Sequence, residues 1–133
     1  AKLGTMATVV YVLLGAVGLP IFANFHGGIS ALAGITGGYI WAWPFMTFLC
    51  GIHPKVQNKT ANWAIRIVLA LLGLAIVEVI GGIQWHFVGG SMSLSAIAIY
   101  SLIAFVPKDI VITILALFIA VPVRRAIEYA GAR

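Results

Sequence analysis

Long apolar stretches, separated by short polar or glycine-rich segments, account for most of the chain. They cover residues 3–22, 37–52, 63–88 and 94–123. A helix needs roughly 20 apolar residues to cross the hydrocarbon core of a bilayer. The pattern therefore predicts an all-α membrane protein, a polytopic helical bundle in which residues 1–133 form a single transmembrane domain.

The last apolar stretch is too long for one helix, and Pro107-Lys108-Asp109 interrupts it. We expect two segments, residues 94–106 and 110–123. At about 1.5 Å per residue the first would reach only about 20 Å, which is short of a hydrocarbon core of about 30 Å. Length alone leaves open whether it crosses or inserts partly.

The basic residues favour partial insertion. If residues 94–106 do not cross, seven of the eight Lys and Arg residues fall at one face and only Lys108 at the other. Lys and Arg collect in cytoplasmic loops. We therefore expect four spans in all, with residues 94–106 as a surface or re-entrant segment before the fourth. The basic face would be cytoplasmic, and residues 23–39, 84–93 and 107–109 would lie at the opposite face.

Composition supports membrane residence and excludes several other classes. Only 8% of the residues are charged and the mean hydropathy is +1.12, whereas soluble domains carry about 25% charged residues. The net charge of +5 is then an orientation signal rather than a sign of nucleic-acid binding. Cys50 is the only cysteine, and the histidines lack metal-ligand spacing. We therefore expect no metal and no cofactor.

The loop after the first stretch combines glycines with hydrogen-bonding side chains. Asn24, His26 and Gly27 are followed by Tyr39 after a second Gly-Gly pair. Glycine lets the backbone approach a ligand closely. The loop is therefore either a flexible connection or a structured cap over a pocket, and the polar residues favour the cap.

Three further positions have both a structural and a functional interpretation. Asp109, next to Lys108, either caps the last helix or points its carboxylate into a pocket. Glu78, near the middle of the third stretch, is either a hydrogen-bonded core residue or a functional carboxylate. Trp85 is either an interfacial anchor or a stacking surface for a planar ligand.

Two motifs resemble a known family. Gly15-Ala16-Val17-Gly18-Leu19-Pro20-Ile21-Phe22-Ala23, followed by Gly27-Gly28 and by Gly34-x-Thr36-Gly37-Gly38-Tyr39, resembles BioY, the biotin-binding S component of energy-coupling factor (ECF) transporters. Phe105-Val106-Pro107-Lys108-Asp109 is similar to the family's Phe-x-Pro-Gly-Asp before its last helix. The likeness runs through nearly all of the chain.

The resemblance implies a six-helix fold, of which this chain would hold helices three to six. The chain begins at Ala1 rather than at a Met, and we expect two helices upstream. The function implied is capture of biotin from outside for uptake, in a bacterial plasma membrane. The implied partners are the ECF transmembrane coupling subunit and the ATPase subunits, since the chain has no nucleotide motif of its own.

The family's site carries over only in part. Tyr39 and Asp109 match, but His26, Ile40 and Ile112 stand where the family often has Asn, Arg and Lys, and Lys108 replaces a Gly. The substrate-binding residues we expect are Asn24, His26, Gly27, Tyr39, Trp85, Lys108 and Asp109.

Other functions stay open on the sequence. The subunit would import another small vitamin-like substrate if the departures from the family pattern change the pocket. An intramembrane enzyme would use Glu78 and Asp109 with the histidines, and these groups would have to lie within hydrogen-bond reach of one another. A structural or channel-like bundle would have no ligand cavity.

Overall fold

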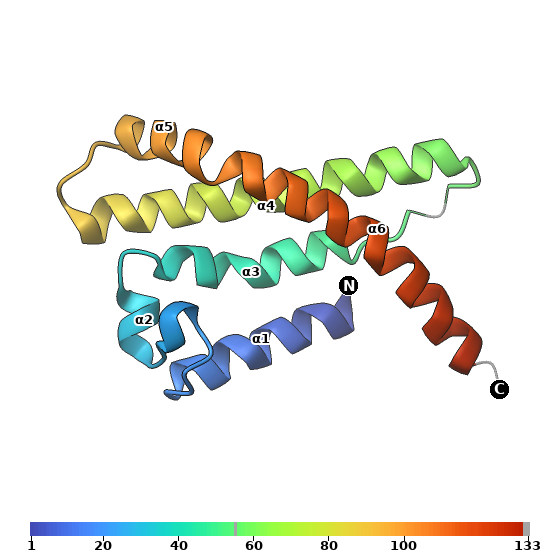
Figure 1. Cartoon of the computed structure of the whole chain (residues 1–133), viewed down its shortest axis with the longest axis horizontal. Coiled ribbons are helices and arrows are strands. Elements are labelled where there is room, and N and C mark those ends of the chain that lie inside the picture. Colours follow the sequence, from blue (N-terminus) through green and yellow to red (C-terminus); the bar gives the residue numbers. More distant parts are fainter. Residues whose placement is uncertain (55, 132–133) are drawn as a thin grey trace.

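The computed structural model describes residues 1–54 and 56–131, and every named element in those ranges is helical (Figure 1). The predicted all-α bundle is confirmed. The elements are α1 (Lys2–Ala16), η1 (Ala23–Phe25), α2 (Ile29–Ala33), α3 (Gly37–Cys50), α4 (Lys59–Gly89), α5 (Leu94–Ala104) and α6 (Val106–Gly131).

The helices are arranged around α4, which packs on α3 on one side and on α5 and α6 on the other. α1 packs against the far side of α3. α4 and α6, with 31 and 26 residues, are long and apolar enough to cross a membrane. Asn58 caps α4, because its side-chain oxygen accepts hydrogen bonds from the backbone of Thr60 and Ala61. The cap starts the helix four residues before the apolar stretch begins at Trp63.

α1 is shorter than the sequence predicts. We expected a helix through residue 22, but α1 ends at Ala16. The chain turns at Gly18, where φ is +114°. Residues other than glycine rarely adopt this backbone conformation. Phe22 then folds back, and its ring occupies the space where a side chain at Gly15 would lie.

α3 and α4 approach each other closely through glycines. A Cβ atom at Gly38 would lie 2.7 Å from the Ile80 carbonyl oxygen, and one at Gly81 would lie 2.4 Å from the Tyr39 ring. Neither position therefore has room for a side chain. Such small-residue contacts let helix backbones pack tightly inside a membrane, where burial from water gives no driving force.

α5 and α6 are two parts of one bent path. α5 has 11 residues, about 16 Å of helix, and α6 continues in the same general direction (Figure 1). That this segment alone does not cross the bilayer remains a prediction. The break, however, falls at Phe105 rather than at Pro107, because a proline is tolerated in the first turn of a helix.

The face at which this joint lies remains a prediction. We expected residues 107–109 at the same face as the glycine-rich loops. Val106, the first residue of α6, lines a cavity together with Glu78 of α4, and α5 packs along α4.

The basic residues gather at one end of the bundle, as predicted. The C-terminal part of α6 and the segment that leads into α4 lie at the same end (Figure 1), where Lys59, Arg66 and Arg124 line one cavity. The amino group of Ala1, beside Lys2, donates to the Gly51 carbonyl at that end. Lys55 and Arg133 lie outside the described residues. That this end is cytoplasmic remains a prediction.

Candidate functional site

Four of the predicted site residues meet where α5 joins α6. We call this group, with its neighbours, the joint cluster. It draws one residue from α3, one from α4 and the rest from α5, α6 and the residue between them. Its members are Tyr39, Trp85, Tyr100, Ser101, Phe105, Lys108 and Asp109.

Aromatic rings connect the members of the joint cluster. Trp85 meets Tyr100 edge to face, with ring centroids 5.6 Å apart. Tyr100 meets Phe105 at 5.6 Å, and Phe105 lies 6.3 Å from Tyr39. These separations are typical of favourable aromatic pairs. The hydroxyl groups of Tyr39 and Ser101 lie 3.4 Å apart, which ties α3 to α5.

Lys108 and Asp109 form an ion pair at the edge of these rings. The Lys108 Nζ lies 2.6 Å from the Asp109 Oδ1 and 5.5 Å from the centroid of the Phe105 ring. The side chain of Lys108 is 58% exposed and that of Asp109 only 25%. Asp109 is therefore the less exposed partner of this pair.

Asp109 does not act as the helix cap that the sequence allowed. Its backbone N–H already donates to the Phe105 carbonyl, so Asp109 lies inside the first turn of α6. Its side chain accepts from Lys108, and no described backbone N–H donates to it. Thr113, one turn further on, is buried.

A cavity of about 390 Å³ lies beside the joint cluster between α4 and α5. Its walls are mostly apolar, with Gly82, Ile97 and Val106 among them, and its polar lining comes from Glu78 and Ser101. The Glu78 Oε2 atom is buried and has no hydrogen-bond partner among the described residues. An apolar cavity with few polar groups is typical of a small-molecule site.

The glycine-rich loop occupies a different place. Asn24 has a left-handed backbone (φ 58°), and His26 exchanges backbone hydrogen bonds with Phe22 and Ala23. A Cβ at Gly27 would lie 2.2 Å from the Leu19 carbonyl oxygen. Every recorded hydrogen bond of residues 17–27 stays inside that segment or goes to α1. That it closes over Asp109 remains a prediction.

Gln84 is a functional candidate that the sequence reasoning missed. Its side-chain amide donates to the carbonyls of Leu32 and Gly34, at 2.8 and 2.7 Å, and so fastens α2 to α4. The sequence did place Gln84 beside Trp85 at the end of an apolar stretch. A polar side chain there, facing a glycine-rich loop, is the signal that would have identified it.

The arrangement suits binding more than catalysis. His26 interacts with the Ala23 carbonyl, and His86 with the Met92 carbonyl. Among the described residues, neither ring is hydrogen-bonded to Glu78 or Asp109, so the constellation that an intramembrane enzyme would need is not assembled. An aromatic wall with one carboxylate and one ammonium group instead offers stacking and charged hydrogen bonds to a ligand.

Two helices are long and apolar enough to cross a membrane, and shorter helices pack beside them around the joint cluster. A family model described as the BioY family matches residues 1–129. The chain belongs to the BioY family, which confirms the resemblance noted in its motifs.

Curated relatives agree with this assignment. The chain is 34% identical over 119 residues to the probable biotin transporter BioY of Pyrococcus horikoshii, covering 90% of this chain and 67% of the relative. It is 40% identical over 86 residues to the biotin transporter BioY of Thermotoga maritima, covering 65% and 49%.

One solved structure has a similar fold. The 2.1 Å crystal structure of the S component for biotin from an ECF-type ABC transporter matches with a TM-score of 0.79 and 30% identity, over 91% of this chain and 65% of that one. The chain thus spans about two thirds or less of the length of these three proteins. All three are described as transporters or transporter components, and none as an enzyme.

Proposed function

We propose that this chain is the ligand-capturing part of a membrane importer and that its ligand is biotin. The observation that carries the proposal is the joint cluster. A partly buried carboxylate, an ammonium group and an aromatic wall meet beside an apolar cavity. The cluster lies in a chain whose fold resembles an S component for biotin.

The chemistry of biotin suits these groups. Its ureido ring carries two N–H donors, and the Asp109 carboxylate can accept hydrogen bonds from them. Its fused ring and valeryl chain are apolar and fit against Trp85 and Phe105. The predicted contacts of Asn24 and His26 with the ligand require the glycine-rich loop to reach the joint cluster in the bound state.

The Lys108–Asp109 pair sets a condition on binding. Biotin carries its ureido ring and its carboxylate at opposite ends, so one molecule cannot engage both side chains while they stay paired at 2.6 Å. We assign Asp109 to the ureido ring, because it is the less exposed of the two side chains. Lys108, which is more exposed, then leaves the pair and turns toward the ligand carboxylate.

The same proposal includes partners and location. The chain carries no nucleotide-binding motif, so transport requires ATPase subunits and a transmembrane coupling subunit, as in an ECF-type assembly. We place the protein in the bacterial plasma membrane, with the basic end in the cytoplasm.

Calorimetry with the purified protein in detergent tests the ligand directly. We expect saturable binding of biotin and weaker or no binding of thiamine and riboflavin, which serve as controls for other vitamin importers. Binding of one of these controls but not of biotin would keep the capture function and change its substrate. Absence of binding by all three would overturn the proposal.

A further inference from the structure

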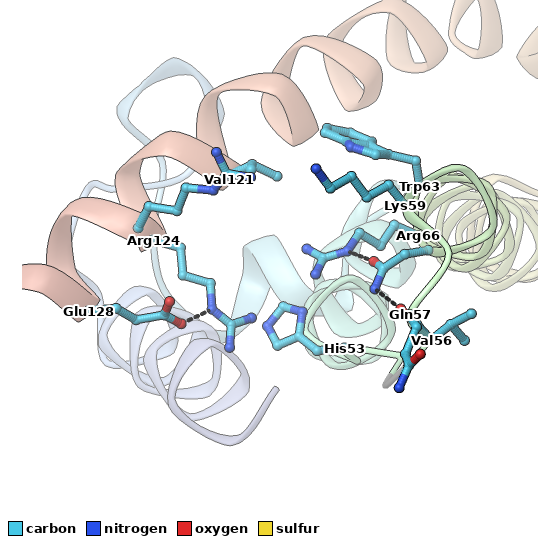
Figure 2. A pocket seen from close by; sticks show the side chains of 11 residues that line it. His53, Val56, Gln57, Lys59, Trp63, Arg66, Val121, Arg124 and Glu128 are labelled. Carbon is cyan, nitrogen blue, oxygen red and sulfur yellow. Dashed lines mark hydrogen bonds and ion pairs between the residues drawn. The ribbon is translucent and has the colours of Figure 1, made fainter.

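A second cavity lies at the opposite end of the bundle from the α4–α5 turn, between the start of α4 and the C-terminal half of α6 (Figure 2). Its volume is about 390 Å³. We call it the basic pocket. Most of the residues that line it are charged or polar, and they come from three segments of the chain. The full lining is His53, Val56, Gln57, Lys59, Asn62, Trp63, Arg66, Val121, Arg124, Arg125 and Glu128.

The charge of the basic pocket is strongly unbalanced. Four Lys and Arg side chains and one carboxylate line it, so its net charge is 4 − 1 = +3. Glu128 is paired with Arg124 at 2.7 Å. Among the described residues, Lys59, Arg66 and Arg125 have no carboxylate partner. In Figure 2 the nitrogen-bearing ends of Lys59 and Arg66 point into the space between the two helices.

The pKa of His53, which lines the pocket, reflects this excess of positive charge. Burial lowers the pKa of His53, and the nearby charges of Arg124 and Arg66 lower it further, with a smaller contribution from the amino terminus. Glu128 acts in the opposite direction but does not outweigh them. The pocket therefore disfavours a further positive charge and favours an anion.

The wall of the pocket toward the middle of the membrane is apolar. Trp63 stacks on Phe118 with ring centroids 5.4 Å apart, and Val121 lies beside them. Beyond this wall α6 presents exposed apolar side chains, among them Phe118 and Ile119, which are 62% and 63% exposed. A charged pocket thus continues directly into a surface that suits acyl chains.

We propose that the basic pocket binds the headgroup phosphate of an anionic phospholipid from the leaflet at this end, with an acyl chain lying along α6. A small soluble anion would match the charges but not the adjoining apolar surface. A phospholipid matches both, and basic pockets between membrane helices are known to hold anionic headgroups. The inference does not depend on the ligand of the joint cluster.

Native mass spectrometry of the purified protein in detergent tests the proposal. The probes are phosphatidylglycerol, which is anionic, and phosphatidylcholine, which is zwitterionic, each with the same acyl chains. The informative variant is Lys59→Gln/Arg125→Gln, because neither side chain has a recorded hydrogen bond among the described residues. The matched controls are Lys59→Arg/Arg125→Lys, which keeps both charges, and Lys2→Gln, which removes a charge outside the pocket.

We expect the parent to retain phosphatidylglycerol in preference to phosphatidylcholine. The double Gln variant should bind phosphatidylglycerol about 25-fold more weakly, at about fivefold per basic residue. Both controls should behave like the parent. Equal retention of the two lipids, or a double Gln variant that binds like the parent, overturns the proposal. Displacement of the lipid by millimolar inorganic phosphate also overturns it and identifies a site for soluble phosphate.

Discussion

The ring of Tyr39 on α3 lies against Gly81 on α4, so closely that a Cβ atom at position 81 would come within 2.4 Å of the ring. The neighbouring Gly82 faces a different helix, and a Cβ there would lie 3.6 Å from Ile97, an ordinary contact. The two adjacent glycines thus differ in whether a side chain would fit at their positions. Gly81 sets the position of a joint-cluster residue, whereas Gly82 lines the cavity beside it.

Gly81→Ala should destabilise the protein by about 1–3 kcal/mol, which is typical of overpacking a tight contact. Gly82→Ala is the matched control and should be neutral or stabilising by up to about 1 kcal/mol, because Ala favours the helix. Thermal unfolding in detergent, followed by tryptophan fluorescence, measures both. Equal effects of the two substitutions would contradict the contact between Gly81 and Tyr39.

Tyr39→Phe removes a hydroxyl group that lies 3.4 Å from the Ser101 Oγ. The loss should cost about 0.5–1.5 kcal/mol of stability. A double-mutant cycle with Ser101→Ala isolates the interaction, for which the expected coupling is about 0.6 kcal/mol, the average for membrane helices. If the two effects simply add, the hydroxyl groups do not interact.

Gln84→Glu keeps the size of the side chain but removes both N–H donors to Leu32 and Gly34. Each carbonyl keeps a second donor, Trp41 Nε1 at Leu32 and the Gly37 N–H at Gly34. The cost is therefore that of two hydrogen bonds at about 0.5–1.5 kcal/mol each, about 1–3 kcal/mol together. Hydrogen exchange should rise in residues 29–36 more than in α1. Unchanged exchange in that segment would show that Gln84 does not hold α2 in place. Gln84→Met, which also lacks donors but adds no charge, should give the same pattern.

Asp109→Asn tests the proposed ligand contact. The variant loses charge-assisted hydrogen bonds of about 1.5–3 kcal/mol each. One such loss weakens biotin binding about 10- to 150-fold. Lys108→Gln should have a smaller effect, because it also frees Asp109 from its ion pair. A folded Asp109→Asn variant that binds biotin as tightly as the parent would remove Asp109 from the site.

His53 predicts how stability depends on pH. Its pKa in the folded protein is lowered from 6.5, first by burial and then by Arg124 and Arg66. The unfolded chain therefore binds more protons than the folded protein as the pH falls through about 6.5, and folding stability decreases there. The midpoint temperature of unfolding should therefore decrease as the pH is lowered from about 7.5 to about 5.5. His53→Gln should flatten this dependence, and a slope unchanged in the variant would assign it to other groups.

The class of fold, and the gathering of basic residues at one end of the bundle, could be predicted from the sequence. The long, mostly apolar stretches within α4 and α6 predict helices of membrane-spanning length, and the distribution of Lys and Arg predicts which ends of the helices lie together. The end of α1 was wrong because the apolar residues continue to Phe22, whereas the turn occurs at Gly18. Glycine conformation depends on what packs around it, and here Phe22 fills the space over Gly15.

The candidate site was only partly accessible to sequence reasoning. Tyr39 and Ser101 are 62 positions apart, and no local pattern states that they meet. Gln84 was overlooked because its partners are backbone carbonyls, which leave no trace in the side-chain sequence.

The length of α4 has a consequence for how the molecule sits in its bilayer. Its 31 residues extend about 46 Å, whereas the hydrocarbon core is about 30 Å thick. The helix is therefore longer than the hydrocarbon core is thick, and we expect its basic end to lie outside the hydrocarbon. A thicker bilayer would draw Lys59 and Arg66 toward hydrocarbon, and a thinner one would make the helix tilt. Bilayer thickness thus becomes a variable to which the orientation of this protein should respond.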